Sequence, residues 1–271
     1  MARRRTLRAL ALLPAVAVAL AAAGCAESTK SEGTVAGGEI SLVEPGTLTT
    51  CTHLPYEPFQ FKQGGKTVGF DVDLVDLVAR DLGVEQKIVD APFDEGIQSG
   101  ESLNSGQCDV AAAAMTITEE RKKNLDFSDP YFSAEQALLV KKGSEITDLS
   151  QLDGKTLGVQ VGTTGQIYAE ENKDKFGYKI KVFDDLALQQ TDVRTGGVAA
   201  AINDNGVLLN FAKNHPDTEV TKEFTTGDKY GIGVQKGNKA LLAKVNESLA
   251  KAKQSGEYDK IYEKWFGAKP E

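Results

Sequence analysis

Short apolar runs alternate with amphipathic stretches along most of this chain of 271 residues. Residues 47–52 and 156–160 have the length and composition of buried strands, and 138–140 is a third candidate. The stretch 70–82 has apolar residues at helical spacing and stops before Gly83, a residue that commonly ends helices. Strands that alternate with helices predict parallel sheets with helices on both faces. We therefore expect an α/β fold that binds its ligand beyond the carboxyl ends of the strands.

Further elements are expected on the same grounds. A short strand over 109–114 should lead into a helix opened by residues 118–120, and two helices should follow near the end of the chain, over 240–255 and 258–266. Arg121 would then lie in the first turn of a helix, where the helix dipole favours an anionic partner.

The first 24 residues have the features of a secretion signal. Four arginines precede the apolar stretch 9–23, which is shorter than the roughly 20 apolar residues that span a bilayer. Cys25 follows small residues and resembles the acylated cysteine of a bacterial lipoprotein, although Ala22 replaces the usual large aliphatic residue. We expect a signal peptide at 1–24, a lipidated Cys25 with a flexible tether over 25–45, and anchoring to the outer face of the cell membrane. Ordinary secretion with an incidental Cys25 is the alternative.

Charge and motifs exclude several function classes. The chain has 31 Lys and Arg against 39 Asp and Glu, and the balance is 27 against 39 without the four arginines of the signal. Such an acidic body repels phosphate backbones, so we expect no nucleic-acid partner. His53 and His215 have no metal-ligand spacing around them, and no HExxH, GxSxG or Walker motif is present. We expect no metal, no cofactor and no catalytic residue.

Five segments carry a family resemblance when they are taken in order. They are 56–61 (YEPFQF), 69–74 (GFDVDL), 115–121 (MTITEER) with the following 126–131 (DFSDPY), 162–164 (GTT) and 262–267 (YEKWFG). Together they resemble the polar amino-acid-binding proteins of ABC importers, which have the type II periplasmic-binding-protein fold. That resemblance implies two α/β lobes with a ligand cleft between them. Lobe 1 would comprise 46–132 and 230–267, lobe 2 would comprise 138–226, and the hinge strands would lie at 131–137 and 225–232.

The resemblance also implies a set of ligand-binding residues. Arg121 would hold the carboxylate of a free amino acid, because its planar guanidinium donates two parallel hydrogen bonds. Asp204 would bind the ammonium group. Four further residues would complete the polar part of the site: Thr116, Thr164, Ala114 and Thr163. The alternatives are a solvated Arg121 that pairs with the neighbouring glutamates, and an Asp204 that serves as a turn or helix cap.

The ligand's side chain would lie between Tyr56 and Phe93, with plain core packing as the alternative, more so for Phe93. His53 stands where many relatives have an acid that holds the distal cation of a basic ligand. A histidine is not a fixed anion. We therefore expect basic amino acids to be disfavoured and glutamine or glutamate to be favoured, with His53 and Gln160 facing the distal group. The alternative is that His53 only caps the end of the strand.

These inferences predict a receptor rather than an enzyme. Hinge closure around a free amino acid would create the outline that the permease subunits of an importer recognise, and we expect a monomer. A secreted cyclohexadienyl dehydratase on the same fold and a sensory binding module are the alternatives. Asp71 and Asp73 suit a helix start rather than a metal site.

The two cysteines of the body are expected to be too far apart to bond. Cys51 lies near the end of its strand, whereas Cys108 precedes a neighbouring parallel strand. At about 3.3 Å per residue their separation would exceed disulfide reach. We expect free thiols, with a bridge as the alternative because the strand register is open.

Overall fold

The computed structural model describes residues 33–34 and 40–269, and the body formed by 32–271 is one compact unit. The predicted signal peptide and Cys25 lie outside the described residues.

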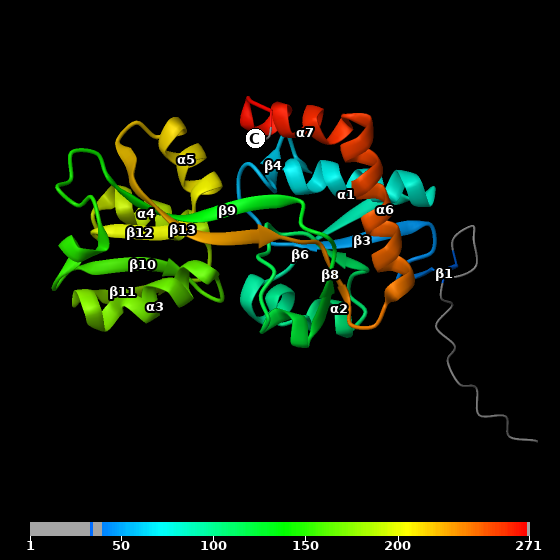
Figure 1. Cartoon of the computed structure of the whole chain (residues 1–271), viewed down its shortest axis with the longest axis horizontal. Helices are drawn as coiled ribbons and strands as arrows, with labels where there is room; N and C mark the ends of the chain where they lie inside the picture. The colour runs from blue at the N-terminus through cyan, green and yellow to red at the C-terminus, as the bar shows by residue number, and fades with distance from the viewer. Residues whose placement is uncertain (1–32, 35–39, 270–271) are drawn as a thin grey trace, which may run out of the picture. The chain divides into compact units, whose positions relative to one another are not determined.

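The body contains two five-stranded sheets (Figure 1). We call the halves built on them lobe 1 and lobe 2. In spatial order, the lobe 1 sheet consists of β6 (Glu85–Asp90), β3 (Thr47–Thr52), β7 (Val110–Ala111), β14 (Gly233–Gln235) and β8 (Leu125–Phe127). The lobe 2 sheet consists of β11 (Lys179–Phe183), β10 (Thr156–Gln160), β12 (Ala200–Asp204), β9 (Phe132–Lys141) and β13 (Thr218–Tyr230).

Both sheets are mixed, which corrects the expectation of parallel sheets. In lobe 1, β3 is parallel to β6 and β7, but β14 is antiparallel to β7 and β8. In lobe 2, β10 is parallel to β11 and β12, but β9 is antiparallel to β12 and β13. The antiparallel strands belong to the parts of the chain that leave one lobe and return from the other.

β9 and β13 form the connection between the lobes. They pair antiparallel from Phe132 opposite Tyr230 to Lys141 opposite Thr218, and Figure 1 shows them running side by side between the two halves. At the lobe 1 end, Tyr230 forms a bridge with Thr116. Both strands overlap the predicted hinge segments, while the residue boundaries proposed for the lobes stay a prediction.

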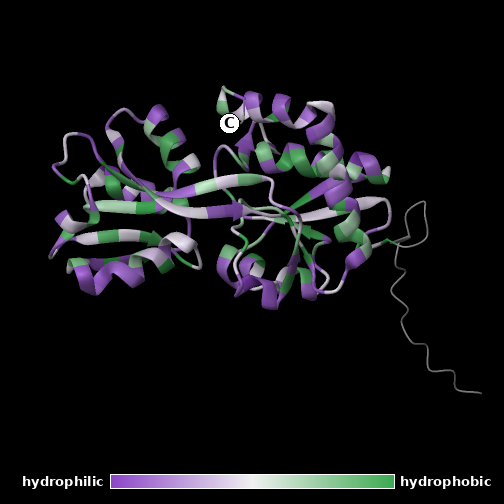
Figure 2. Ribbon diagram, in the orientation of Figure 1, coloured by the Kyte–Doolittle hydropathy of each residue, from purple (hydrophilic) through white to green (hydrophobic). Residues whose placement is uncertain are grey.

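Helices cover both faces of each sheet. Lobe 1 carries α1 (Phe70–Leu82), α2 (Glu101–Asn104), α6 (Lys239–Ser255) and α7 (Glu257–Phe266); lobe 2 carries α3 (Thr164–Phe176), α4 (Leu186–Thr195) and α5 (Asn205–Asn214). In Figure 1, α1, α6 and α7 lie on one side of the lobe 1 sheet and α2 on the other, while α3 lies opposite α4 and α5 in lobe 2. Apolar residues gather on the strands and on the helix faces turned toward them (Figure 2). No described helix is both long and apolar enough to cross a membrane.

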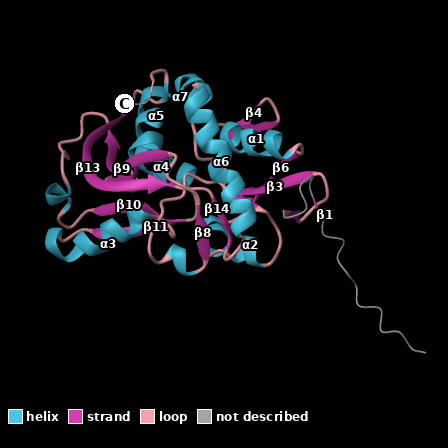
Figure 3. Ribbon diagram, turned by 45° about the vertical axis from the view of Figure 1, so that its right-hand side comes forward, coloured by secondary structure: helices cyan, strands magenta, loops and turns pink. Residues whose placement is uncertain are grey.

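The smaller elements complete the two lobes. They are β1 (Gly33–Thr34), β2 (Ser41–Leu42), the hairpin of β4 (Phe61–Gln63) and β5 (Lys66–Val68), a π-helical turn at Phe93–Gln98, and 3₁₀ turns at Arg121–Lys123 and Leu149–Leu152. Figure 3 shows β4 close to α1 and α7. The contact includes the rings of Phe61 and Trp265, whose centres are 5.7 Å apart.

Several predicted elements are confirmed with their bounds. α1 spans 70–82 and ends at Gly83, whose φ of 73° is left-handed; β3 and β10 also have the predicted limits. Two predictions fail around the site. The strand expected over 109–114 is only Val110–Ala111, and the helix expected after residue 118 is the single 3₁₀ turn at Arg121. The dipole argument for Arg121 is therefore wrong, because a three-residue turn has little dipole to offer.

The folded body begins earlier than expected. Residues 41–42 form β2, Leu42 is buried in the core, and the backbone N–H of Val43 donates to Asp109 Oδ1 at 2.7 Å. The end of the predicted tether therefore belongs to lobe 1, because Leu42 has apolar surface to bury there.

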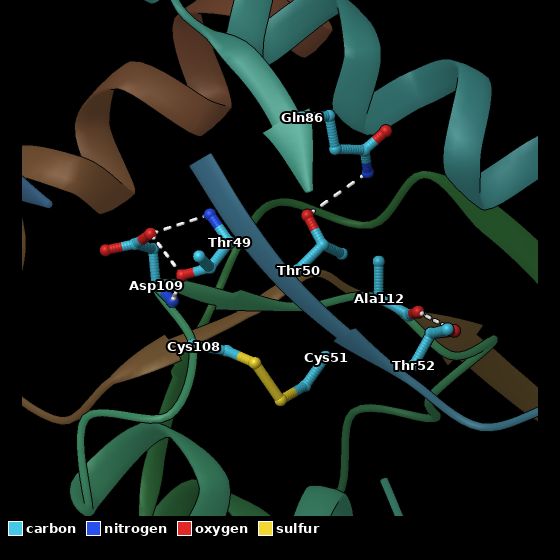
Figure 4. Close-up of a disulfide and its surroundings, with 8 residues drawn as sticks. All are labelled: Thr49, Thr50, Cys51, Thr52, Gln86, Cys108, Asp109 and Ala112. Atoms are coloured by element: carbon cyan, nitrogen blue, oxygen red, sulfur yellow. Dashed lines mark hydrogen bonds between the residues drawn. A yellow bond between two sulfur atoms is a disulfide. The ribbon is translucent and has the colours of Figure 1, made fainter. Parts of the chain in front are cut away.

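The prediction of free thiols is also wrong, because Cys51 and Cys108 form a disulfide (Figure 4). The pairing of β3 with β7 sets Cys51 opposite Ala111, so a straight strand would place Cys108 three residues away. Instead the chain bends at residues 107 and 109, and the Cα atoms of the two cysteines are 5.7 Å apart.

Candidate ligand-binding site

A small cavity of about 20 Å³ lies between the lobes. All ten residues that the sequence analysis nominated line it, and they come from both lobes: His53, Tyr56, Phe93, Ala114, Thr116, Arg121, Gln160, Thr163, Thr164 and Asp204. Gln60 and Ala113, which the sequence analysis missed, complete the lining. The structure thus brings the whole predicted set together, while the role of each residue toward a ligand stays a prediction.

Arg121 is buried and links the two lobes. Its Nη1 donates to the carbonyl oxygen of Thr116 in lobe 1 at 2.7 Å, and its Nη2 donates to the carbonyl oxygen of Gly162 in lobe 2 at 2.9 Å. The guanidinium carbon lies 5.3 Å from the centre of the Phe93 ring, a cation–π contact. Burial lowers the pKa of Arg121 to about 10, so the side chain remains charged at neutral pH.

The alternative for Arg121, pairing with the neighbouring glutamates, is not found. Glu119 and Glu120 form exposed ion pairs with Lys122 and Lys123 instead. The arginine is therefore held inside the cleft by carbonyl oxygens. Among the described residues it forms no salt bridge.

Asp204 ends β12 and is the other buried charge of the cavity. Its carboxylate accepts hydrogen bonds from the hydroxyls of Tyr56 (2.9 Å) and Tyr230 and from Nε2 of Gln136. It precedes α5 but makes no side-chain cap to that helix, so the capping alternative fails. Burial is the largest influence on the pKa of Asp204 and raises it to about 6, against the lowering effect of the Tyr230 hydrogen bond.

The residues around Asp204 could not be found from local sequence. Gln136 lies directly opposite Asp204 in the pairing of β9 with β12, and Tyr230 ends β13. Asn203 Oδ1 lies 2.8 Å from the Tyr56 hydroxyl, and its amide nitrogen donates to Gln160 Oε1 at 3.2 Å. Strand register, which the sequence left open, is the signal that would have identified them.

Three threonines form the polar rim of the cavity. Thr163 caps α3, where its hydroxyl oxygen accepts from the N–H of Gln166 at 3.1 Å. The hydroxyl oxygens of Thr116 and Thr164 lie 3.5 Å apart and face each other across the lobes. Gly162, with a φ of 72°, brings the α3 loop so close to lobe 1 that an added Cβ would lie 2.5 Å from Asp94 Oδ1. The lobes are therefore closed on each other.

Phe93 and His53 both line the cavity, and each also has a structural contact. Phe93 is buried in the lobe 1 core as well as facing Arg121. Nδ1 of His53 lies 3.0 Å from the carbonyl oxygen of Ala91, while its Nε2 is buried and has no hydrogen-bond partner among the described residues. Gln60 donates to the carbonyl of His53 at 3.3 Å, and its own Oε1 likewise has no partner in the described part of the chain.

An acidic groove adjoins the cavity and shares His53 and Phe93 with it. Four carboxylates line this groove, and its lining residues include no lysine or arginine. They are Asp90, Asp94 and Glu95 of lobe 1 and Asp184 of lobe 2.

A family model described as bacterial extracellular solute-binding proteins, family 3, matches residues 48–268. The chain belongs to this family. The L-cystine-binding protein TcyJ of Escherichia coli K12 is 35% identical over 262 residues, which cover 95% of each chain. The ABC transporter glutamine-binding protein GlnH of Bacillus subtilis is 39% identical over 211 residues, which cover 76% of this chain and 75% of the relative.

Solved structures agree with this assignment. An ancestral arginine-binding protein bound to arginine is 45% identical with a TM-score of 0.77, and the match covers 82% of this chain and 98% of that one. The family and the two-lobed periplasmic-binding-protein fold predicted from the motifs are thereby confirmed. The relatives are named as binding proteins rather than enzymes, in line with the predicted class of this solute-binding protein.

Proposed function

We propose that this solute-binding protein captures a free amino acid outside the cell and delivers it to the permease subunits of an ABC importer. One observation carries the proposal: a buried guanidinium, Arg121, and a buried carboxylate, Asp204, come from different lobes and line one cavity. A free amino acid has a carboxylate and an ammonium on one carbon, so it can bridge the two. Each charge-assisted bond counts for more in such a buried site than in water.

Within this class we propose L-glutamine or L-glutamate as the preferred ligand. The distal cation of a basic ligand would need a fixed anion at the position of His53, and a histidine is not one. The buried Nε2 of His53 can instead form a hydrogen bond with the distal amide or carboxylate of glutamine or glutamate. Gln160 lines the same cavity from lobe 2. The glutamine-binding name of the Bacillus subtilis relative supports this choice.

The acidic groove favours a second candidate, a basic amino acid. Asp90, Asp94 and Asp184 line the space next to His53 and could attract the cation of arginine or lysine. The ancestral protein bound to arginine supports this candidate.

Processing, membrane anchoring and closure of the protein belong to the same proposal. We infer that residues 1–24 are removed, that Cys25 carries the lipid anchor at the outer face of the membrane, and that the monomer closes about β9 and β13. Diacylation supplies the two-chain anchoring that one chain alone does not.

Isothermal titration with all common amino acids tests the proposal. The tightest binding of glutamine or glutamate supports the first candidate, and the tightest binding of arginine or lysine supports the second. Substitutions Arg121→Ala and Asp204→Asn should each weaken binding about 100-fold or more, since removing one partner of a buried charged contact costs roughly 2–5 kcal/mol. The exposed pair of Arg194 and Asp217 provides the matched controls Arg194→Ala and Asp217→Asn, which should leave affinity unchanged. Binding of no amino acid by the wild type would refute the proposal.

A further inference from the structure

Asp71 is a buried carboxylate that lies outside the cavity but is bonded to its wall. It occupies the first turn of α1 and is only 2% exposed. One of its oxygens, Oδ2, accepts the backbone N–H of Ala114 at 2.6 Å. The other, Oδ1, accepts the hydroxyl of Tyr131 at 2.8 Å. Both carboxylate oxygens thus accept hydrogen bonds from groups that are far from Asp71 in the sequence.

Ala114, whose backbone N–H donates one of these bonds, has an unusual backbone conformation. Its φ of 48° makes it the single non-glycine residue of the described chain in the left-handed region. A residue with a Cβ adopts this conformation only when its surroundings hold it there, and such residues concentrate at functional sites. Ala114 lines the cavity together with Ala113 and Thr116, and the Thr116 carbonyl accepts from Arg121. The turn at Ala114 therefore sets the direction of the backbone that holds the arginine.

The start of α1 also holds the opposite wall of the cavity. The backbone N–H groups of Phe70 and Asp71 donate to the carbonyl oxygens of Pro58 and Phe59, each at 3.0 Å, in the loop that carries Tyr56. This approach requires Gly69, because an added Cβ would lie 2.0 Å from the Phe59 oxygen. One helix start thus contacts both the Tyr56 loop and the Ala114 turn.

We propose that Asp71 is a positioning residue of the ligand site: its carboxylate holds Ala114 in the left-handed conformation and so fixes the segment 113–116 against the cavity. The inference rests on the proposed function only for its binding readout. Tyr131 immediately precedes the hinge strand β9, so the same carboxylate ties the cavity wall to the start of the hinge.

The hydrogen bonds from Ala114 and Tyr131 are the interactions that stabilise the charged form of Asp71. Burial raises the pKa of Asp71 to about 7, while the bonds from Ala114 and Tyr131 lower it. No lysine or arginine pairs with it in the described chain. The charged form of this buried carboxylate is therefore stabilised by the two hydrogen bonds that its oxygens accept.

Substitutions of Asp71 and Ala114 separate positioning from a general structural role. The readout is affinity for L-glutamine and for L-arginine by titration calorimetry. Asp71→Ala should weaken binding about tenfold or more, because the Ala114 N–H loses its acceptor. Asp71→Asn should stay within about threefold of the wild type, since its amide oxygen can still accept that N–H. The double variant Asp71→Ala/Ala114→Gly should recover to within about threefold, because glycine adopts positive φ without support.

Asp109→Ala is the matched control. Asp109 is also buried and accepts the N–H groups of Val43 and Thr49, yet it does not line the cavity. This variant should lose stability and keep its affinity. Wild-type affinity in Asp71→Ala, or no recovery in the double variant, would overturn the proposal. If Asp71→Ala does not fold, the double variant decides: recovery of fold and affinity supports the proposal, and failure to fold while Asp109→Ala folds contradicts it.

Hydrogen exchange of the Ala114 amide in the ligand-free protein gives an answer independent of the ligand. Exchange should be at least about tenfold faster in Asp71→Ala than in Asp71→Asn or Asp109→Ala. If the wild type binds neither amino acid, the function proposed above is in question while this measurement still tests the role of Asp71. Equal exchange in the three variants would refute it.

Discussion

Breaking the Cys51–Cys108 disulfide should cost this protein a large share of its stability. The bond joins cysteines 57 residues apart. In the chain-entropy description, closing a loop of that length restricts the unfolded chain by about 4 kcal/mol at 25 °C. For a domain of this size the loss corresponds to a fall in Tm of about 8–16 °C. Because Cys51 is fully buried and Cys108 nearly so, a reductant reaches the bond only after unfolding.

Urea denaturation of the body from residue 26 onward, with and without dithiothreitol, measures this contribution. With an m-value of about 2–2.5 kcal/mol/M, the midpoint should fall by roughly 1.5–2 M on reduction. A thiol assay on the denatured protein should find no free thiol before reduction and two afterwards. Affinity for the ligand should not change in the Cys51→Ala/Cys108→Ala variant if that variant folds, since neither cysteine lines the cavity. Two free thiols before reduction, or coincident urea transitions, would refute the reasoning.

Three further predictions concern the closed cleft. Gly162→Ala should weaken ligand binding about tenfold by calorimetry, because its Cβ would lie 2.5 Å from Asp94 of the other lobe. Gly196→Ala, at a similarly positive φ of 81° but in open space, should leave binding unchanged, and equal effects of the two substitutions would contradict this prediction. Tyr56→Phe removes the hydroxyl that contacts Asn203 and Asp204 and should cost five- to tenfold in affinity, or about 1 kcal/mol. Tyr178→Phe, whose buried hydroxyl bonds within lobe 2, should cost nothing in affinity. Titrations at pH 5 to 8 should show affinity falling below pH 6 as Asp204 is protonated, since its pKa is raised to about 6 and a neutral carboxyl does not pair with an ammonium. The same raised pKa means that Asp204 favours the ligand-free fold below pH 4 and that this contribution is lost as the pH rises through 6. Both effects should vanish in Asp204→Asn, and a flat wild-type profile would argue against the assignment.

The elements that could be predicted from sequence are those with a complete local pattern. The amphipathic period of α1, with Gly83 at its end, gave both limits of that helix, and compact apolar runs gave β3 and β10. Ten of the residues that line the cavity were predicted from the family resemblance. Five of them belong to its short motifs, namely Tyr56, Thr116, Arg121, Thr163 and Thr164, and the other five stand at positions that the resemblance implies. Their side chains meet only in the folded protein, but their identity is visible in the chain.

What could not be predicted depends on contacts between distant segments. The strand expected over 109–114 ends at Ala111, and Ala114 is held in a turn by Asp71, a partner 43 positions earlier. The disulfide was missed because the bends at 107 and 109 cannot be inferred from strand geometry. Gln136 and Tyr230 were missed because strand register places them beside Asp204. In each case the arrangement depends on contacts between residues that are far apart in the sequence.

Arg121 bonds the Thr116 carbonyl in one lobe and the Gly162 carbonyl in the other through two different nitrogens. With the ligand carboxylate on the same guanidinium as proposed, one side chain takes part in both closure and capture. Linkage then works in both directions: a ligand that steadies the guanidinium favours closure, and a transporter that pulls the Gly162 loop away loosens the ligand to the same degree. A membrane partner would therefore need no contact with the amino acid to release it.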